Sequence, residues 1–140
     1  MKKQTLTVFF PGGKRVDASY KGHVIKTDQP EYAGGENSAP APFDLFLASI
    51  ATCSGFYFLA FLQQRGIAAE EAHLEMSTER NPSTKMIEKI SIEIHLPPDF
   101  PEKYKKAVVK AVESCAVKQH IINPPSFIIE TKESGRGRSD

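Results

Sequence analysis

Two cysteines are the residues of this sequence best suited to carry chemistry. Cys53 lies in the run ATCSG (residues 51–55), whose small and hydroxylated side chains leave room for a ligand or a second thiol. Cys115 continues the apolar stripe of a later predicted helix and is expected to point at the core. Free cysteine also packs readily as a small buried hydrophobe, so structural packing is the alternative for each thiol. Their spacing alone does not show whether the two thiols meet.

The histidines and glycines predict no metal or nucleotide site. The four histidines, His23, His73, His95 and His120, are scattered over a predicted turn, strands and a helix, without an i, i+4 pair or a CxxC motif. The glycine pairs fit neither phosphate-binding pattern, GxxxxGK[ST] or GxGxxG. A cysteine hydrolase or transferase would need a histidine and an orienting carboxylate near Cys53, and no motif singles one out. We therefore expect neither a metal nor another cofactor.

The first cysteine is carried by the most apolar stretch of the chain, residues 42–65. Fifteen of the twenty residues from 43 to 62 are apolar or Cys, which predicts a helix that must be covered on nearly every face. Pro42 suits the first helical position and Gly66 suits the stop, while Asp44 falls in the first turn, where the helix dipole favours a carboxylate. Cys53 lies three turns further on, too far for the dipole to activate its thiol.

A helix of this length, about 35 Å at 1.5 Å per residue, could also cross a bilayer. Small and polar residues recur through its middle, no basic cluster flanks it, and both flanking regions have the composition of soluble α/β sequence. These features favour a buried helix of a soluble protein over a membrane span.

The elements around this helix predict a single α+β domain over residues 1–140. Residues 1–27 contain strand-like stretches at 4–10, 15–20 and 23–26 and predict a β-hairpin or meander. Residues 72–131 predict a β-β-α-β region, with strands at 72–78 and 86–96 and a last strand at 127–130. Its helix is expected to begin with Asp99 as N-cap and Glu102 at capping-box spacing. Residues 132–140 are expected to form a mobile tail.

Composition narrows the function classes. The chain has 18 Lys and Arg against 17 Asp and Glu, a net charge of +1, which lacks the basic footprint of a nucleic-acid-binding protein. The first thirteen residues are too polar and their apolar run too short for a signal peptide, so we expect a cytoplasmic protein. In that reducing compartment two cysteines are expected to be free thiols or a redox pair rather than a permanent disulfide.

Two segments of the sequence resemble the OsmC/Ohr family. The segment GGENSAPAPFDLFLASIATCSGFYFLAFLQQRG resembles the family's central region, in which a glycine-rich loop leads into a buried helix bearing the first redox cysteine. The segment ESCAVKQHIINPPSFII resembles the second cysteine motif, with Ala116 where the family commonly has proline. The order of predicted elements matches the family over nearly the whole chain.

This resemblance implies an OsmC-like fold, with antiparallel sheets from two chains wrapped around paired central helices in an intertwined homodimer. It also implies a thiol peroxidase of oxidative stress defence, in which Cys53 attacks an organic hydroperoxide, Cys115 resolves the product, and a dithiol restores both thiols. In the family an arginine and a glutamate hold the first thiol as thiolate. The matching glutamate position here is Phe43, so Arg15 and Asp44 are the candidates, and the chain resembles a divergent branch.

The absent glutamate leaves a second function open. The same apolar dimer cavity could hold an acyl or aromatic ligand in a non-catalytic binding protein whose cysteines only pack.

Overall fold

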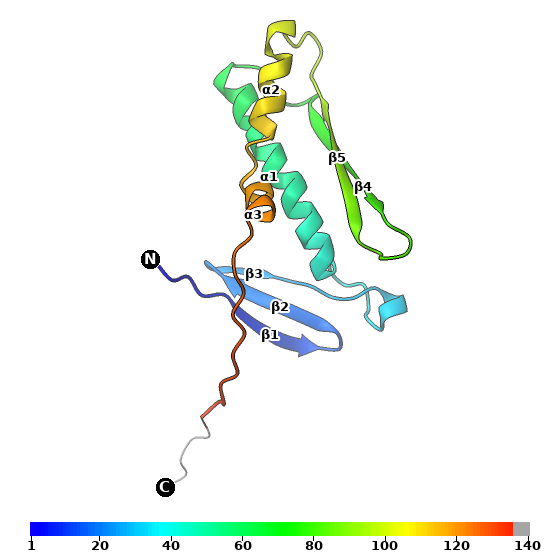
Figure 1. Cartoon of the computed structure of the whole chain (residues 1–140), viewed down its shortest axis with the longest axis vertical. Helices are drawn as coiled ribbons and strands as arrows, with labels where there is room; N and C mark the ends of the chain where they lie inside the picture. The colour runs from blue at the N-terminus through cyan, green and yellow to red at the C-terminus, as the bar shows by residue number, and fades with distance from the viewer. Residues whose placement is uncertain (136–140) are drawn as a thin grey trace.

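The computed structural model, which describes residues 1–135, begins with a three-stranded antiparallel sheet. β1 (Thr7–Gly12), β2 (Arg15–Tyr20) and β3 (His23–Ile25) follow one another in the order β1-β2-β3. β2 has the bounds predicted from its sequence, and Gly13 supplies the positive φ that the tight β1–β2 turn requires. The sheet lies beyond the N-terminal end of the long helix (Figure 1).

A buried aspartate organises the loop between β3 and that helix. Asp28 is 1% exposed, and its carboxylate accepts hydrogen bonds from the Ser38 hydroxyl at 2.5 Å, the Ser38 N–H at 3.0 Å and the Gln29 N–H at 2.8 Å. These bonds, the Ser38 hydroxyl first, lower the pKa of Asp28 to about 2. Gly35 is required because a Cβ there would overlap the Gln29 carbonyl. The loop, which also contains the short 3-10 helix η1 (Glu31–Ala33), is therefore fixed in shape.

The long helix α1 (Pro42–Gln64) begins and ends at the predicted signals. Asp44 accepts the Ala41 N–H at 3.3 Å, and Gly66 adopts the left-handed φ of 62° just past the helix. The buried residues share one side of the helix: Ile50, Ser54, Phe58, Phe61 and Leu62. Large apolar side chains elsewhere on it are exposed, among them Phe43, Phe46, Phe56 and Leu59. The expected cover on every face is therefore not supplied by one chain.

By length and composition alone α1 could also cross a membrane, a test that the core helix of a soluble protein passes as well.

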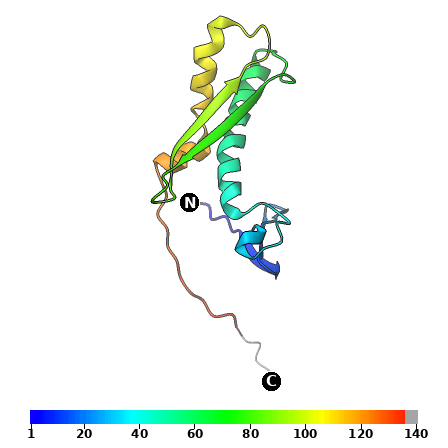
Figure 2. The same cartoon turned by 90° about the vertical axis from the view of Figure 1, so that its right-hand side faces the viewer.

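A second, two-stranded sheet packs along α1. β4 (His73–Arg80) and β5 (Ile87–His95) form an antiparallel hairpin in which Leu74 pairs with Ile94 and Met76 with Ile92. Leu74 points at the helix, because a Cβ on Gly55 would lie 3.8 Å from its side chain. Figures 1 and 2 show the hairpin running beside α1. Both strands match the predicted segments to within two residues.

The helical region after β5 differs from the prediction. Asp99 has a φ of 62° and is not an N-cap, because that position requires extended backbone. The region begins instead with a 3-10 turn, η2 (Glu102–Tyr104), followed by α2 (Lys105–Val112) and α3 (Ala116–Ile122). The helix is interrupted at Cys115, whose backbone is extended at φ −50° and ψ 120°. Cys115 is thus the N-cap of α3 and not part of a continuous helix face.

The described core joins α1 to α2. Its buried residues are Phe58, Phe61, Leu62, Val108 and Val112. The expected strand at residues 127–130 is not formed, and Phe127, Ile128 and Ile129 are 83–93% exposed on an extended segment. A strand needs a neighbour for its backbone hydrogen bonds, and residues 1–135 of one chain offer none there. Part of the predicted tail, residues 136–140, lies outside the described residues. The α+β class, with antiparallel strands and one long helix, is confirmed.

Candidate functional site

The second cysteine lies against the middle of α1. Cys115 has no exposed surface, and its Sγ lies 4.0 Å from the Ile50 carbonyl oxygen. The backbone N–H of Lys118, in the first turn of α3, donates to the same sulfur at 3.4 Å. The interruption between α2 and α3 therefore turns this thiol toward the helix that carries the other cysteine.

The two thiols are neighbours within one chain. Burial raises the pKa of Cys115, but hydrogen bonds from the Lys118 N–H, the Cys53 thiol and the Ser54 hydroxyl outweigh it, so the net pKa lies below the usual value for cysteine. Cys53 is partly exposed, whereas Cys115 is fully buried, and both are free thiols. The structure thus brings together the two candidate residues whose meeting the sequence left open.

An apolar cavity of about 430 Å³ lies beside the residues that surround Cys115. Three of its lining residues, Ile50, Ser54 and Lys118, also contact Cys115. Most of the other walls are aliphatic side chains from β5, α2 and α3: Ile90, Ile92, Ile94, Val109, Val112, Ile121 and Ile122. This volume falls within the range of pockets that bind small organic ligands.

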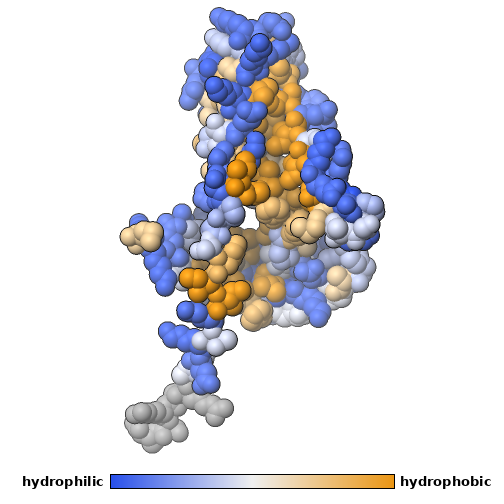
Figure 3. Space-filling model, in the orientation of Figure 1, coloured by the Kyte–Doolittle hydropathy of each residue, from blue (hydrophilic) through white to orange (hydrophobic). Residues whose placement is uncertain are grey.

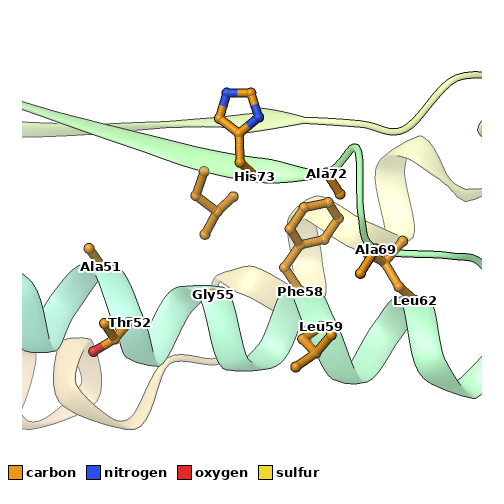
Figure 4. A pocket seen from close by; sticks show the side chains of 10 residues that line it. Ala51, Thr52, Gly55, Phe58, Leu59, Leu62, Ala69, Ala72 and His73 are labelled. Atoms are coloured by element: carbon orange, nitrogen blue, oxygen red, sulfur yellow. The ribbon is translucent and has the colours of Figure 1, made fainter.

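A second cavity, of about 320 Å³, separates α1 from β4 and is shown in Figure 4. Its lining is almost wholly apolar and includes Ala51, Gly55, Leu59 and Leu74. Neither cysteine lines either of these two cavities, but the larger one shares Ile50, Ser54 and Lys118 with the surroundings of Cys115.

The charged candidates lie away from the thiols. Arg15, on β2, forms an ion pair with Glu36, and its Nε donates to the Ser38 hydroxyl at 3.2 Å. Within the described residues of one chain, the Asp44 carboxylate accepts the N–H of Ala41 and no hydrogen bond from Arg15. Within residues 1–135 no hydrogen bond joins Arg15 to Cys53, which lies in the middle of α1. Figure 1 shows β2 beyond the N-terminal end of that helix. Glu36 is the partner that sequence reasoning missed.

His73 and His95 lie side by side, although their positions in the sequence suggested that the histidines are scattered. His73 on β4 pairs in register with His95 on β5, and their rings stack with centroids 4.3 Å apart. Glu75 lies within ion-pair distance of both. Pairing the two predicted strands as a hairpin would have revealed this contact, because residues opposite each other share a face.

The sequence matches the family model described as OsmC-like protein over residues 35–130, a range that contains both cysteines. No curated protein matches the sequence.

Several solved structures share the fold. A Psychrobacter arcticus protein described as an osmotic stress induced and detoxification response protein is 21% identical, with a TM-score of 0.70 over 85% of this chain and 88% of that chain. An OsmC-like protein from Mycoplasma pneumoniae is 17% identical, with a TM-score of 0.64 over 88% and 89%. A Legionella pneumophila structure described as an organic hydroperoxide resistance protein is 20% identical, with a TM-score of 0.52 over 86% and 90%. The expected fold is confirmed by these likenesses.

Proposed function

The chain belongs to the OsmC-like protein family, and from this premise we propose that it reduces organic hydroperoxides with Cys53 and Cys115. Membership of a family with relatives described as hydroperoxide resistance proteins supports a redox or peroxide-related role. The observation that supports the specific proposal is the position of Cys115 against α1, 4.0 Å from the Ile50 carbonyl oxygen and close enough to Cys53 for that thiol to help lower its pKa.

The cycle has three steps. The Cys53 thiolate attacks the distal oxygen of the hydroperoxide, the O–O bond breaks, and the alcohol leaves with a proton while the sulfur becomes sulfenic acid. The Cys115 thiolate then attacks this sulfur, forms the disulfide and releases water. A dithiol reductant exchanges with the disulfide, restores both thiols and leaves as its own disulfide. No further cofactor is required.

The different exposure of the two sulfurs assigns their roles. Cys53 is partly exposed and can react with a peroxide from solvent, whereas Cys115 is fully buried. The lowered pKa of Cys115 suits a resolving thiol, because it is the thiolate that attacks sulfur.

The cavity beside the thiols supports an organic substrate. Its aliphatic walls would accept the hydrocarbon part of the peroxide by the hydrophobic effect, which hydrogen peroxide cannot exploit. Lys118 lies at this wall and adds a positive charge near the thiols.

We propose a homodimer as the working form, in the cytoplasm, where dithiol reductants keep cysteines reduced. The single chain exposes 11538 Å². A compact monomer of 15.5 kDa exposes about 7,200 Å² by the usual scaling with mass. The excess includes the apolar side of α1 and the segment around Phe127, where Figure 3 shows apolar side chains at the surface. A second chain would bury these surfaces and give residues 127–130 a strand to pair with.

The dimer would also bring a charged group to Cys53. We propose that Arg15 of one chain stabilises the thiolate of the other and that Glu36, rather than Asp44, orients its guanidinium. Cys53 should then be alkylated more slowly near neutral pH in Arg15→Ala than in the wild type, whereas Lys14→Ala should not change this rate. Equal rates would remove Arg15 from the mechanism.

Intact-mass spectrometry tests the whole cycle. Cumene hydroperoxide should remove two hydrogens from the wild-type chain, and a dithiol should return them. An unchanged mass after excess peroxide would contradict the peroxidase. The second candidate, a binding protein, would then be favoured by the cavity of about 430 Å³, whose volume suits a small apolar ligand.

A further inference from the structure

Four polar side chains gather on one face of the β4–β5 hairpin, near its open end. His73 lies opposite His95 and Glu75 lies opposite Glu93 in the antiparallel register. Side chains alternate between the two faces of a strand, so all four lie on the face opposite Leu74, which packs on α1. Figure 4 shows the His73 ring directed away from α1. This cluster is therefore separate from the thiols, and of its members only His73 also lines the smaller of the two cavities described above.

The ligand atoms have the spacing of a first coordination shell. Nε2 of His73 lies 3.5 Å from one Glu75 oxygen, and Nε2 of His95 lies 3.6 Å from the other. One ligand atom from each of these three residues fits within a group no wider than 4.8 Å. Zinc bonds to nitrogen and oxygen of 2.0–2.2 Å in a tetrahedron place neighbouring ligand atoms roughly 3.4 Å apart.

Charge and hydrogen bonding also favour a cation at this place. Glu75 and Glu93 are like charges directly opposite each other, an arrangement that destabilises a strand pair unless a positive charge lies between them. Nε2 of His95 is shielded from solvent, and no residue among 1–135 makes a hydrogen bond to it. A buried ring nitrogen without a partner is costly, and a metal ion would satisfy it.

We propose that His73, Glu75 and His95 bind a divalent transition-metal ion, with Zn²⁺ as the reference ion. Two imidazoles and a carboxylate suit Zn²⁺, Cu²⁺ and Ni²⁺ better than Ca²⁺ or Mg²⁺, which prefer oxygen ligands. The two ring planes are nearly parallel, at an interplanar angle of 8°, so binding of one ion between them requires one ring to tilt toward the other. The Glu93 carboxylate, 3.5 Å from His95 Nε2, is near enough to complete the shell.

An ion at this position would join the first residue of β4 to the last residue of β5. It would close the open end of the hairpin, the sheet whose β5 strand lines the larger cavity. The proposal concerns binding and does not depend on peroxidase activity.

Equilibrium dialysis against ZnCl₂ tests the site. The full chain should carry Cys53→Ser and Cys115→Ser, because thiols bind zinc as well, and the cysteine-containing chain should be measured in parallel. We expect one Zn²⁺ per chain. His73→Gln or His95→Gln should weaken binding by more than about 10-fold, the smallest loss typical of even an outer-shell partner. His23→Gln, a histidine on β3, is the matched control and should bind as the parent does.

NMR of the imidazole protons gives a readout that needs no substitution at the site. The chain has four histidines, and zinc should shift the signals of His73 and His95 while leaving those of His23 and His120 in place. Shifts spread over all four rings, the absence of shifts at millimolar zinc, or a bound ion retained after both His→Gln changes would each overturn the proposal.

Discussion

The Cys53 thiol, in the middle of α1, lies close enough to Cys115, at the N-cap of α3 of the same chain, to help lower the pKa of Cys115. This proximity depends on the interruption between α2 and α3, because a continuous helix would carry Cys115 along its own axis instead of turning it onto α1. A disulfide between these residues would therefore be intramolecular even in a dimer. Cys115 also lies between the Ile50 carbonyl and the Lys118 N–H, so the resolving thiol is held in place before any oxidation.

Replacing Cys53 and replacing Cys115 should impair the peroxidase cycle in different ways. Cys53→Ser should lose all turnover of cumene hydroperoxide, because the attacking sulfur is gone. Cys115→Ser should consume about one equivalent and then stop, because the sulfenic acid has no resolving thiol. Peroxide consumption and intact mass, followed together, measure both outcomes. Sustained turnover by Cys53→Ser would exchange the assigned roles, and sustained turnover by both variants would exclude the cysteine cycle.

The hydroxyl of Ser54 should help to set the ionisation of Cys115. Its hydrogen bond to the sulfur is one of those that lower the pKa, so Ser54→Ala should raise the pKa of Cys115 and reduce its thiolate fraction at a given pH. Thiolate absorbance against pH in a Cys53→Ser background measures this shift. Ser49→Ala is the matched control, since Ser49 lies on the same helix but donates to the Phe46 carbonyl. An unchanged titration in Ser54→Ala would remove Ser54 from the site.

Local signals predicted α1 and the strands β2 to β5 well, but the strand predicted at residues 127–130 is not formed. Pro42 and Gly66 mark the ends of α1 because their backbone preferences do not depend on distant contacts. The strict alternation of apolar residues from Ile90 to Ile94 likewise predicts β5 whatever surface the strand packs against. The same local reasoning placed Cys115 on a helix stripe, because its apolar spacing continues from α2 and nothing in the sequence predicts the interruption.

Contacts between distant segments could not be predicted in this way. Arg15 pairs with Glu36 because Asp28 fixes the shape of the loop that carries Glu36. The sequence indicated Asp44 instead, because Asp44 lies next to the position at which the family has its glutamate. The strand expected at 127–130 has suitable residues but no neighbouring strand in one chain. In both cases the deciding partner lies far along the sequence or, for residues 127–130, is proposed to lie on a second chain.

Replacing an exposed aromatic residue on α1 should separate the proposed dimer. Phe56 is 63% exposed in the single chain, and Phe56→Lys would place a charge in an apolar interface, where its desolvation is costly. Light scattering should show a dimer for the wild type and a larger monomer fraction for Phe56→Lys at micromolar concentration. Tyr32→Lys, at an exposed position on η1, should remain dimeric. A wild-type chain that is a stable monomer under these conditions would contradict the dimer.

Asp28 should make the stability of the fold depend on acid pH. Its folded pKa of about 2 lies below the value of about 3.9 for an unfolded aspartate, so its contribution is fully present above pH 4 and is lost as pH falls toward 2. Asp28→Asn keeps the shape of the side chain but removes the charge that accepts the Ser38 and Gln29 hydrogen bonds. The variant should therefore unfold at lower urea concentration than the wild type at pH 7, and the difference should shrink between pH 4 and pH 2.

Asp99→Asn is the control, because Asp99 lies at a left-handed backbone position that asparagine tolerates. Urea unfolding at one fixed protein concentration measures all three chains, and a difference for Asp28→Asn that stays constant from pH 7 to pH 2 would show that the carboxylate charge is not what stabilises the loop.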